Sequence, residues 1–218
     1  MKFHSFTTLL ISATALHSCA FAQSNVDPNN KSAWCENIGR TNWRDSGSPP
    51  TVQGAIIAGT FLSGFICNEN CGFLNTGDGS PANSSSYANT TGADFGVNIL
   101  NDNRLGGLAW GENIGWVNFG PHASLAAAQQ ARLDPPAFRL RGYAWGENVG
   151  WINLDHSTHY VGLKCPADFN EDGSVDFFDY LDFVDAFSAN LPSADFNNDS
   201  SIDFFDYLYF VDAFSIGC

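Results

Sequence analysis

Basic residues are scarce in this chain of 218 residues, and its last quarter has none. The sequence holds 9 Lys and Arg against 23 Asp and Glu, which gives a formal net charge of −14. Residues 165–218 carry 12 of these acids and no Lys or Arg. Nucleic acids and anionic membrane surfaces are bound through Lys and Arg against phosphate. We therefore expect neither as a partner.

Catalytic motifs are also lacking. The sequence has no G-x-S-x-G elbow, no H-E-x-x-H and no glycine loop that would cradle a phosphate. Glu112 and Glu147 could be imagined as the two carboxylates of a glycosidase, but they recur at the same place in a repeat, which favours a role in a turn. We predict that the chain is not an enzyme, with a polysaccharide hydrolase as the alternative.

Long apolar runs are missing after the N-terminus, so no transmembrane segment is expected. Residues 1–22 have a short positive start, an apolar stretch from Thr7 to Leu16 and a small-x-small site ending at Ala22. This pattern predicts a cleaved signal peptide and a secreted or cell-surface protein. Lipid modification at Cys19 is the alternative.

A repeat with Trp, Gly and Asn occupies the front of the chain. Residues 107–118 read GLAWGENIGWVN and residues 142–153 read GYAWGENVGWIN, while weaker copies lie at 64–75 and 33–43. Gly and Asn suit a tight turn, and Trp, Val and Ile suit a pleated surface. Each copy therefore predicts a β-hairpin, and residues 23–164 predict a β-rich domain.

The copies resemble Trp-rich repeats of the form G-x-A-W-x-x-N-[IV]-G-W-[IV]-x-F found in bacterial secreted and surface proteins, over about residues 33–155. The resemblance implies a β repeat and no particular chemistry. We expect Trp110, Trp116, Trp145 and Trp151 to pack across the hairpins, with glycan binding by these rings as the alternative. The sequence leaves the pairing of Cys35, Cys67 and Cys71 open.

Two acidic segments near the C-terminus have the spacing of calcium loops. Oxygen-bearing side chains stand at positions 1, 3, 5, 7, 9 and 12, with a bend at position 6. The first loop supplies Asp168, Asn170, Asp172, Ser174, Asp176 and Asp179, and the second supplies Asp195, Asn197, Asp199, Ser201, Asp203 and Asp206. We predict two Ca²⁺ sites. The second should be weaker, because Ser200 replaces Gly173 at the bend and a non-Gly residue at positive φ is strained.

Each loop is followed by apolar residues at helical spacing. We predict that Phe178, Leu181, Val184 and Phe187, with Phe205, Leu208, Val211 and Phe214, form a buried face. The remaining aromatic residues would form an outward face that binds a partner: Phe177, Tyr180, Phe183, Phe204, Tyr207 and Phe210. Cys165 and Cys218 flank the two loops, so a disulfide there would tie the ends together; two unrelated cysteines are the alternative.

A tandem of calcium loop and single helix, with Asp at position 12, resembles a type I dockerin, and the closing Gly217-Cys218 with Cys165 is similar to the GC-type variant. The resemblance covers residues 165–218 and implies attachment to a cohesin-like partner on a scaffold or cell surface. Positions 10 and 11 hold Phe pairs in place of the small polar pairs common in cellulosomal dockerins. The expected fold class is mixed: a β-rich hairpin-repeat domain followed by a small α-helical, dockerin-like calcium-binding module.

Overall fold

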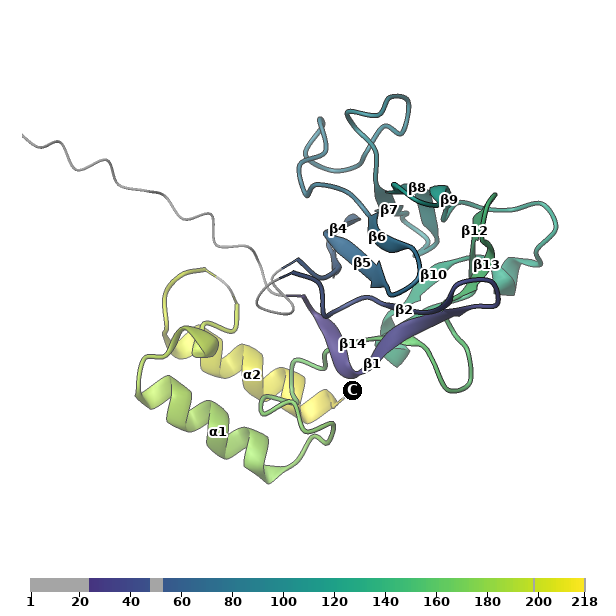
Figure 1. Ribbon diagram of the computed structural model, residues 1–218. Coiled ribbons are helices and arrows are strands. Elements are labelled where there is room, and N and C mark those ends of the chain that lie inside the picture. Colours follow the sequence, from purple (N-terminus) through teal and green to yellow (C-terminus); the bar gives the residue numbers. More distant parts are fainter. Residues whose placement is uncertain (1–23, 48–52, 198, 218) are drawn as a thin grey trace, which may run out of the picture.

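Four β-hairpins, one from each repeat copy, build the main body of the protein (Figure 1). The computed structural model describes residues 24–47, 53–197 and 199–217; the predicted signal peptide at 1–22 and Cys218 lie outside them. The hairpins are β1 (Val26–Cys35) with β2 (Gly39–Asn42), β5 (Phe65–Asn68) with β6 (Gly72–Asn75), β8 (Leu105–Gly111) with β9 (Gly115–Asn118), and β12 (Tyr143–Gly146) with β13 (Gly150–Asn153). Antiparallel pairing within each hairpin confirms the predicted turns.

The predicted mixed fold class is wrong. The described part of the chain is mostly β: the hairpins close into one antiparallel barrel of eight strands with extra strands, and only 18% of it is helical, chiefly in two α-helices. Closure comes from β13, which pairs with β1 through Asn153 and Trp34. A hairpin pattern fixes the pairing inside each unit but not the pairing between the first and last units, so the sequence does not predict the closed barrel.

The four junctions between neighbouring hairpins share one register. The Asn that ends each return strand lies opposite the first aromatic position of the next hairpin, where the second copy has a cysteine instead. The pairs are Asn42 with Cys67, Asn75 with Trp110, Asn118 with Trp145, and Asn153 with Trp34. The same contact therefore recurs four times around the barrel.

A ring of side-chain amides joins the hairpin turns at one end of the barrel. The Asn that follows the repeated Glu donates from Nδ2 to a backbone carbonyl in the preceding hairpin: Asn37 to Val149, Asn70 to Ile38, Asn113 to Cys71, and Asn148 to Ile114, at 2.9–3.2 Å. Two residues after this Asn, every copy has a glycine with φ of 73–80°, a conformation that glycine adopts without strain. The Glu-Asn-x-Gly part of the repeat thus has a structural role.

The barrel interior is filled by small and branched residues from alternating strand positions, such as Ala33, Ile66, Ala109 and Val117. Trp43 is buried among them and meets Phe119 edge to face at 6.0 Å. On the outside, Trp110 and Trp116 pack at 4.6 Å across their hairpin, and Trp145 and Trp151 pack at 4.7 Å. The expected cross-strand packing of these four rings is confirmed.

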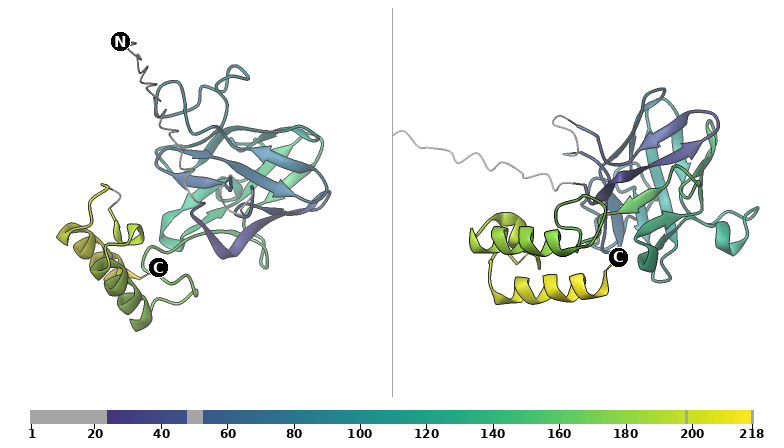
Figure 2. Two further views of the ribbon diagram at one scale, coloured as in Figure 1. Left: turned by 60° about the vertical axis from the view of Figure 1, so that its left-hand side comes forward. Right: turned by 90° about the horizontal axis from the view of Figure 1, so that it is seen from below.

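The remaining strands extend or cover the barrel. They are β3 (Ile56–Ala58), β4 (Phe61–Ser63), β7 (Val97–Ile99), β10 (Arg132–Asp134), β11 (Arg139–Arg141) and β14 (Val161–Leu163). Among them, β14 pairs with β1 and leads the chain out toward the two C-terminal helices. These are α1 (Phe177–Ser188) and α2 (Phe204–Ile216), which lie side by side next to the barrel (Figure 2).

Candidate functional site

The first acidic loop is folded around its own carboxylates. Asp168 accepts hydrogen bonds from the backbone N–H groups of Asp172 and Gly173, at 3.0 and 2.9 Å. Asn170 accepts from Asp172 at 2.9 Å. Asp179, at position 12, reaches back to accept from Asn170 at 3.1 Å and from Asp176 at 2.8 Å. The side chains at positions 1, 3 and 12 therefore shape the backbone of the loop.

The second loop repeats these bonds. Asp195 accepts from the backbone N–H groups of Asp199 and Ser200, at 3.1 and 2.9 Å. Asn197 accepts from Asp199 at 2.9 Å, and Asp206 accepts from Asn197 at 3.1 Å and from Asp203 at 2.8 Å. Two segments 27 residues apart thus adopt the same bonded loop, which a chance cluster of acids would not do.

The carboxylate at position 12 links each loop to its helix. Asp176 caps α1 by accepting from the N–H of Phe178 at 2.8 Å, and Asp179 completes a capping box by accepting from the N–H of Asp176. Asp203 and Asp206 do the same for α2. Asp179 and Asp206 are fully buried. Their burial fixes which face of each helix turns inward.

The acids of the loops have few positive groups to balance them. Burial raises the pKa of the Asp168 carboxyl, and the charges of Asp179 and Asp172 raise it further, while the N–H of Gly173 acts in the opposite direction. The pKa of Asp206 is lowered, chiefly by the N–H of Asp203. Carboxylates that repel one another in a pocket of N–H donors are stabilised by a bound cation.

The donor set of each loop fits calcium. Ca²⁺ takes hard oxygen ligands from carboxylates, amides, hydroxyls and backbone carbonyls, and every predicted ligand carries such an oxygen. Within the described ranges, no three His, Cys, Asp or Glu side chains form a cluster that could hold a metal. Asn170 and Ser174 in the first loop, and Asn197 and Ser201 in the second, would supply the other oxygens. Bound calcium would supply the positive charge that these acids lack.

The predicted inward and outward faces of the helices need correction. Phe183 and Phe210, predicted to face a partner, are fully buried and stack on each other with centroids 4.0 Å apart and planes 5° from parallel. Tyr180 and Tyr207 are half-buried beside them, and their hydroxyls lie 3.4 Å apart. Phe183 lies four residues after the buried Asp179, so both fall on the same face of α1.

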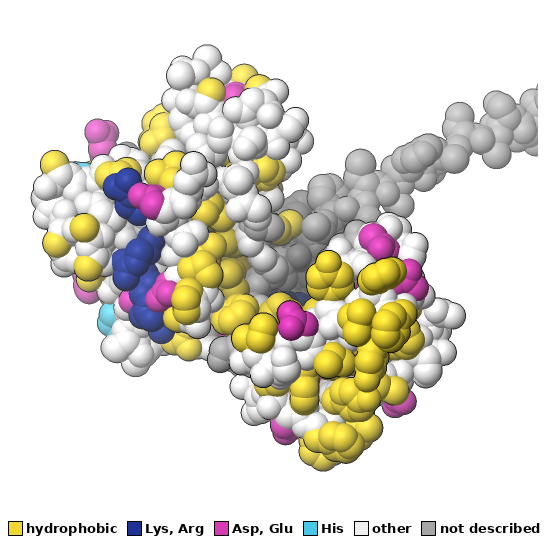
Figure 3. All heavy atoms as spheres, turned by 180° about the vertical axis from the view of Figure 1, so that it is seen from behind, with side chains coloured by type: hydrophobic (Ala, Val, Ile, Leu, Met, Phe, Trp, Pro, Cys, Tyr) yellow, Lys and Arg dark blue, Asp and Glu magenta, His cyan; other side chains and the backbone are white. Residues whose placement is uncertain are grey.

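The exposed apolar surface is formed by other residues. Phe177 and Phe178 on α1 and Phe204 and Phe205 on α2 are 60–64% exposed. Leu181, Leu208, Tyr209 and Ile216 are exposed on the same two helices, and Figure 3 shows apolar side chains gathered over the helices. Phe178, Leu181, Phe205 and Leu208 were predicted to be buried, and that prediction is wrong. We call the eight residues the apolar helix surface.

Cys165 precedes the first loop and is disulfide-bonded. Its predicted partner, Cys218, lies outside the described residues. Cys35, Cys67 and Cys71 are free thiols in the barrel, two of them buried. Burial raises the pKa of the Cys71 thiol, with a smaller contribution from Cys35.

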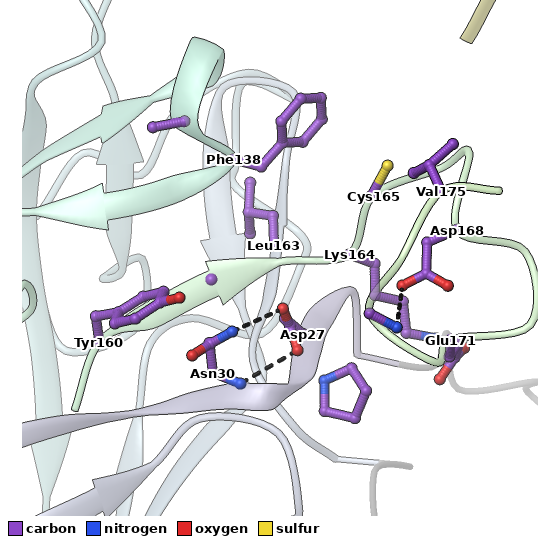
Figure 4. A pocket seen from close by; sticks show the side chains of 14 residues that line it. Asp27, Asn30, Phe138, Tyr160, Leu163, Lys164, Cys165, Asp168, Glu171 and Val175 are labelled. Carbon is purple, nitrogen blue, oxygen red and sulfur yellow. Dashed lines mark hydrogen bonds and ion pairs between the residues drawn. The ribbon is translucent and has the colours of Figure 1, made fainter. Parts of the chain in front are cut away.

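The first loop is joined to the barrel by an ion-pair cluster that sequence reasoning missed. Glu171, at loop position 4, pairs with Arg44 at 3.2 Å and also with Lys164. The Arg44 side chain is only 7% exposed and donates to the carbonyl of Val26. A cavity of about 320 Å³ lies beside this contact, with Asp168 and Glu171 on one wall and Asp27 and Asn30 on the other (Figure 4). Residues 165–218 contain no Lys or Arg. The one hint in the sequence that Glu171 has an ion-pair partner is Lys164, directly before this segment.

The residue at the bend distinguishes the two loops and gives a testable difference in affinity. Gly173 has φ 92° and Ser200 has φ 71°. Ser200→Gly should relieve strain of about 1 kcal/mol and tighten the second Ca²⁺ site about fivefold in a calorimetric titration. Gly173→Ser is the matched control and should weaken the first site by a similar factor. Unchanged affinity in both variants would contradict a role for the bend.

Comparison of the chain with known protein families, with curated proteins and with solved structures found no match. In the part of the chain that the structure describes, no helix is both long and apolar enough to cross a membrane. The interpretation of the site therefore depends on its own geometry and chemistry.

Proposed function

We propose that the protein is an exported, non-enzymatic calcium-binding protein that attaches its barrel to a protein partner. Two Ca²⁺ ions would be held by the loops at 168–179 and 195–206. The apolar helix surface would then dock a cohesin-like protein on a scaffold or cell surface. The hydrogen-bond pattern shared by the two loops is the observation that carries this proposal.

The position of the exposed rings supports docking at this surface. Phe177 and Phe178 begin α1, and Phe204 and Phe205 begin α2, so each pair follows directly on a position-9 carboxylate. Calcium that orders the loops would therefore also order these rings. Contiguous exposed apolar side chains commonly mark an interaction site, and aromatic residues often carry much of the binding energy there.

The composition of the surface also indicates the kind of partner. The rings carry no charge, and the acids around them, such as Asp182 and Asp212, are exposed and unopposed by any Lys or Arg in residues 165–218. A partner with an apolar patch and basic residues at its rim would complement this surface. We expect it to differ from the partners of dockerins that present small polar pairs at positions 10 and 11.

Capture from the native cell envelope tests the proposal. The immobilised chain should retain a specific protein in calcium and release it in EGTA. Combined Phe178→Ala and Phe205→Ala should reduce capture at least about tenfold, since each removes an exposed anchor ring. Leu100→Ala, which shortens an exposed apolar side chain on the barrel, is the control and should capture normally. Capture that ignores calcium, or that survives loss of both helix rings, would refute docking at this surface.

A further inference from the structure

A groove on the barrel lies between the second and third hairpins, away from the helices. It has a volume of about 440 Å³, within the range of about 300–1,000 Å³ typical of small-ligand sites. Phe65 and Phe73 line it from β5 and β6, and Trp110 lines it from β8. The turn of the third hairpin adds Glu112 and Asn113. The groove thus combines aromatic walls with polar groups at one end.

The rings in the groove are exposed because a Trp is missing from the second hairpin. Trp116 and Trp151 each pack on a Trp across their own hairpins, but Phe73 lies opposite Cys67. A cysteine covers much less of an aromatic ring than a tryptophan does. Phe73 remains 54% exposed, and Trp110 is 37% exposed.

Other aromatic positions on the barrel contact rings from outside their hairpins. Phe95 lies edge-on to Trp116 at 5.2 Å. His122 contacts Trp151 at 4.9 Å, and His159 contacts Trp34 at 5.4 Å. Among the described residues, the single ring in contact with Trp110 is Trp116, on the side away from the groove. The groove side of Trp110 therefore has no ring packed against it, whereas Trp34, Trp116 and Trp151 each contact a ring from outside their hairpins.

The polar groups of the groove retain unused hydrogen-bonding capacity. The Glu112 carboxylate makes no hydrogen bond within the described part of the chain. Asn113 uses Nδ2 on the carbonyl of Cys71 and keeps Oδ1 for a ligand. Asn75 uses Oδ1 on the N–H of Gly77 and keeps Nδ2. Hydroxyl groups suit this mixture, since each can both donate and accept.

We propose that this groove binds a neutral polysaccharide. A pyranose ring has an apolar face of C–H groups and a rim of hydroxyls. Trp110 and Phe73 would stack against the apolar faces, and Glu112, Asn75 and Asn113 would hydrogen-bond the hydroxyls. Glu112 gives the groove a negative charge, and the whole chain has a net charge of −14, so an acidic polysaccharide would be repelled.

Calorimetric titration of the full calcium-loaded chain tests the proposal, with cellohexaose, mannohexaose and xylohexaose as neutral probes and polygalacturonic acid as the anionic probe. We expect saturable binding of at least one neutral hexasaccharide and none of polygalacturonic acid. Trp110→Ala and Phe73→Ala should each weaken binding at least about tenfold, as loss of a stacking ring does. Glu112→Gln should have a smaller effect.

Two controls separate loss of the site from loss of the fold. Trp145→Ala changes the equivalent Trp of the fourth hairpin and should leave affinity unchanged. Phe73→Ala removes a ring that is more than half exposed, so its circular dichroism spectrum should match that of the parent chain. The proposal is overturned if no neutral probe binds, if polygalacturonic acid binds better, or if binding survives both ring substitutions.

Discussion

Chelation of calcium should unfold α1 and α2 while the barrel stays folded. The two loops, residues 168–179 and 195–206, hold nine of the chain's Asp and Glu residues, and residues 165–218 contain no Lys or Arg. Among the described residues, Glu171 is the one loop acid that forms ion pairs, with Arg44 and Lys164. Without a cation, repulsion among the carboxylates would oppose the folded loops.

The core between the helices is too small to resist that repulsion alone. Its fully or nearly fully buried members are Phe183, Ala186, Ala194 and Phe210. A core of this size supplies only a few kcal/mol before the cost of ordering the chain is subtracted. The barrel, by contrast, has its own large cluster of buried residues, so we expect it to stay folded in EGTA.

The chain offers separate optical signals for its two parts. All six Trp residues precede Cys165, so tryptophan emission reports on the barrel alone. The α-helical signal at 222 nm comes from α1 and α2, the only α-helices among the described residues. EGTA should abolish the helical signal and leave emission nearly unchanged, and calcium should restore it where magnesium at equal concentration does not. A helical signal indifferent to EGTA would contradict the calcium loops.

Phe183→Ala should weaken the helical pair severely even in calcium. The ring is fully buried and stacks on Phe210 at 4.0 Å. Truncation of a buried Phe to Ala costs about 3–5 kcal/mol, a large share of what so small a core can supply. Because calcium binding is coupled to folding, the apparent affinity for calcium should fall at least about tenfold. Calcium titration followed at 222 nm measures this loss.

Phe177→Ala is the control in the same helix. Its ring is 64% exposed, so its removal should change the calcium titration little. The comparison also tests the orientation of the helix. If Phe177→Ala were the more damaging change, the inward orientation of Phe183 would be contradicted.

Short-range features of the site could be predicted from the sequence because each depends on neighbouring residues. The turn of every hairpin follows from Glu-Asn-x-Gly, and the loops follow from oxygen donors at fixed spacing. A helix after each loop follows from apolar residues at helical spacing, and Asp176 and Asp203 cap these two helices.

The facing of the helices could not be predicted from periodicity, because apolar residues surround α1 almost completely. Phe177, Phe178, Tyr180, Leu181 and Phe183 support more than one apolar stripe. The position of Asp179 would have decided between these stripes. Because its carboxylate must point into the loop, residues one and two helical turns after it also lie on the buried face. Phe183 and Ala186 satisfy that direction, and Leu181 does not.

Neither the closure of the barrel nor the groove beside Trp110 could be predicted from the sequence, for a different reason. Both depend on contacts between repeat copies that are far apart in the chain or that differ by one substitution. The pairing of Trp34 with Asn153 joins the first and last hairpins. The exposure of Phe73 comes from Cys67, a change that looks minor in an alignment of the copies.

The ring of turn asparagines has a consequence for how this architecture can evolve. In an open repeat array, a unit can be added or lost at an end, because each unit needs only its neighbours. Here Asn37 of the first hairpin bonds to Val149 of the last, so every unit has two neighbours and no end exists. A fifth hairpin would have to widen the barrel, and the present core side chains would no longer fill its interior. We therefore expect divergence to be confined to the outer surface of the four existing units, as at the groove where Cys67 stands in place of the Trp of the other copies.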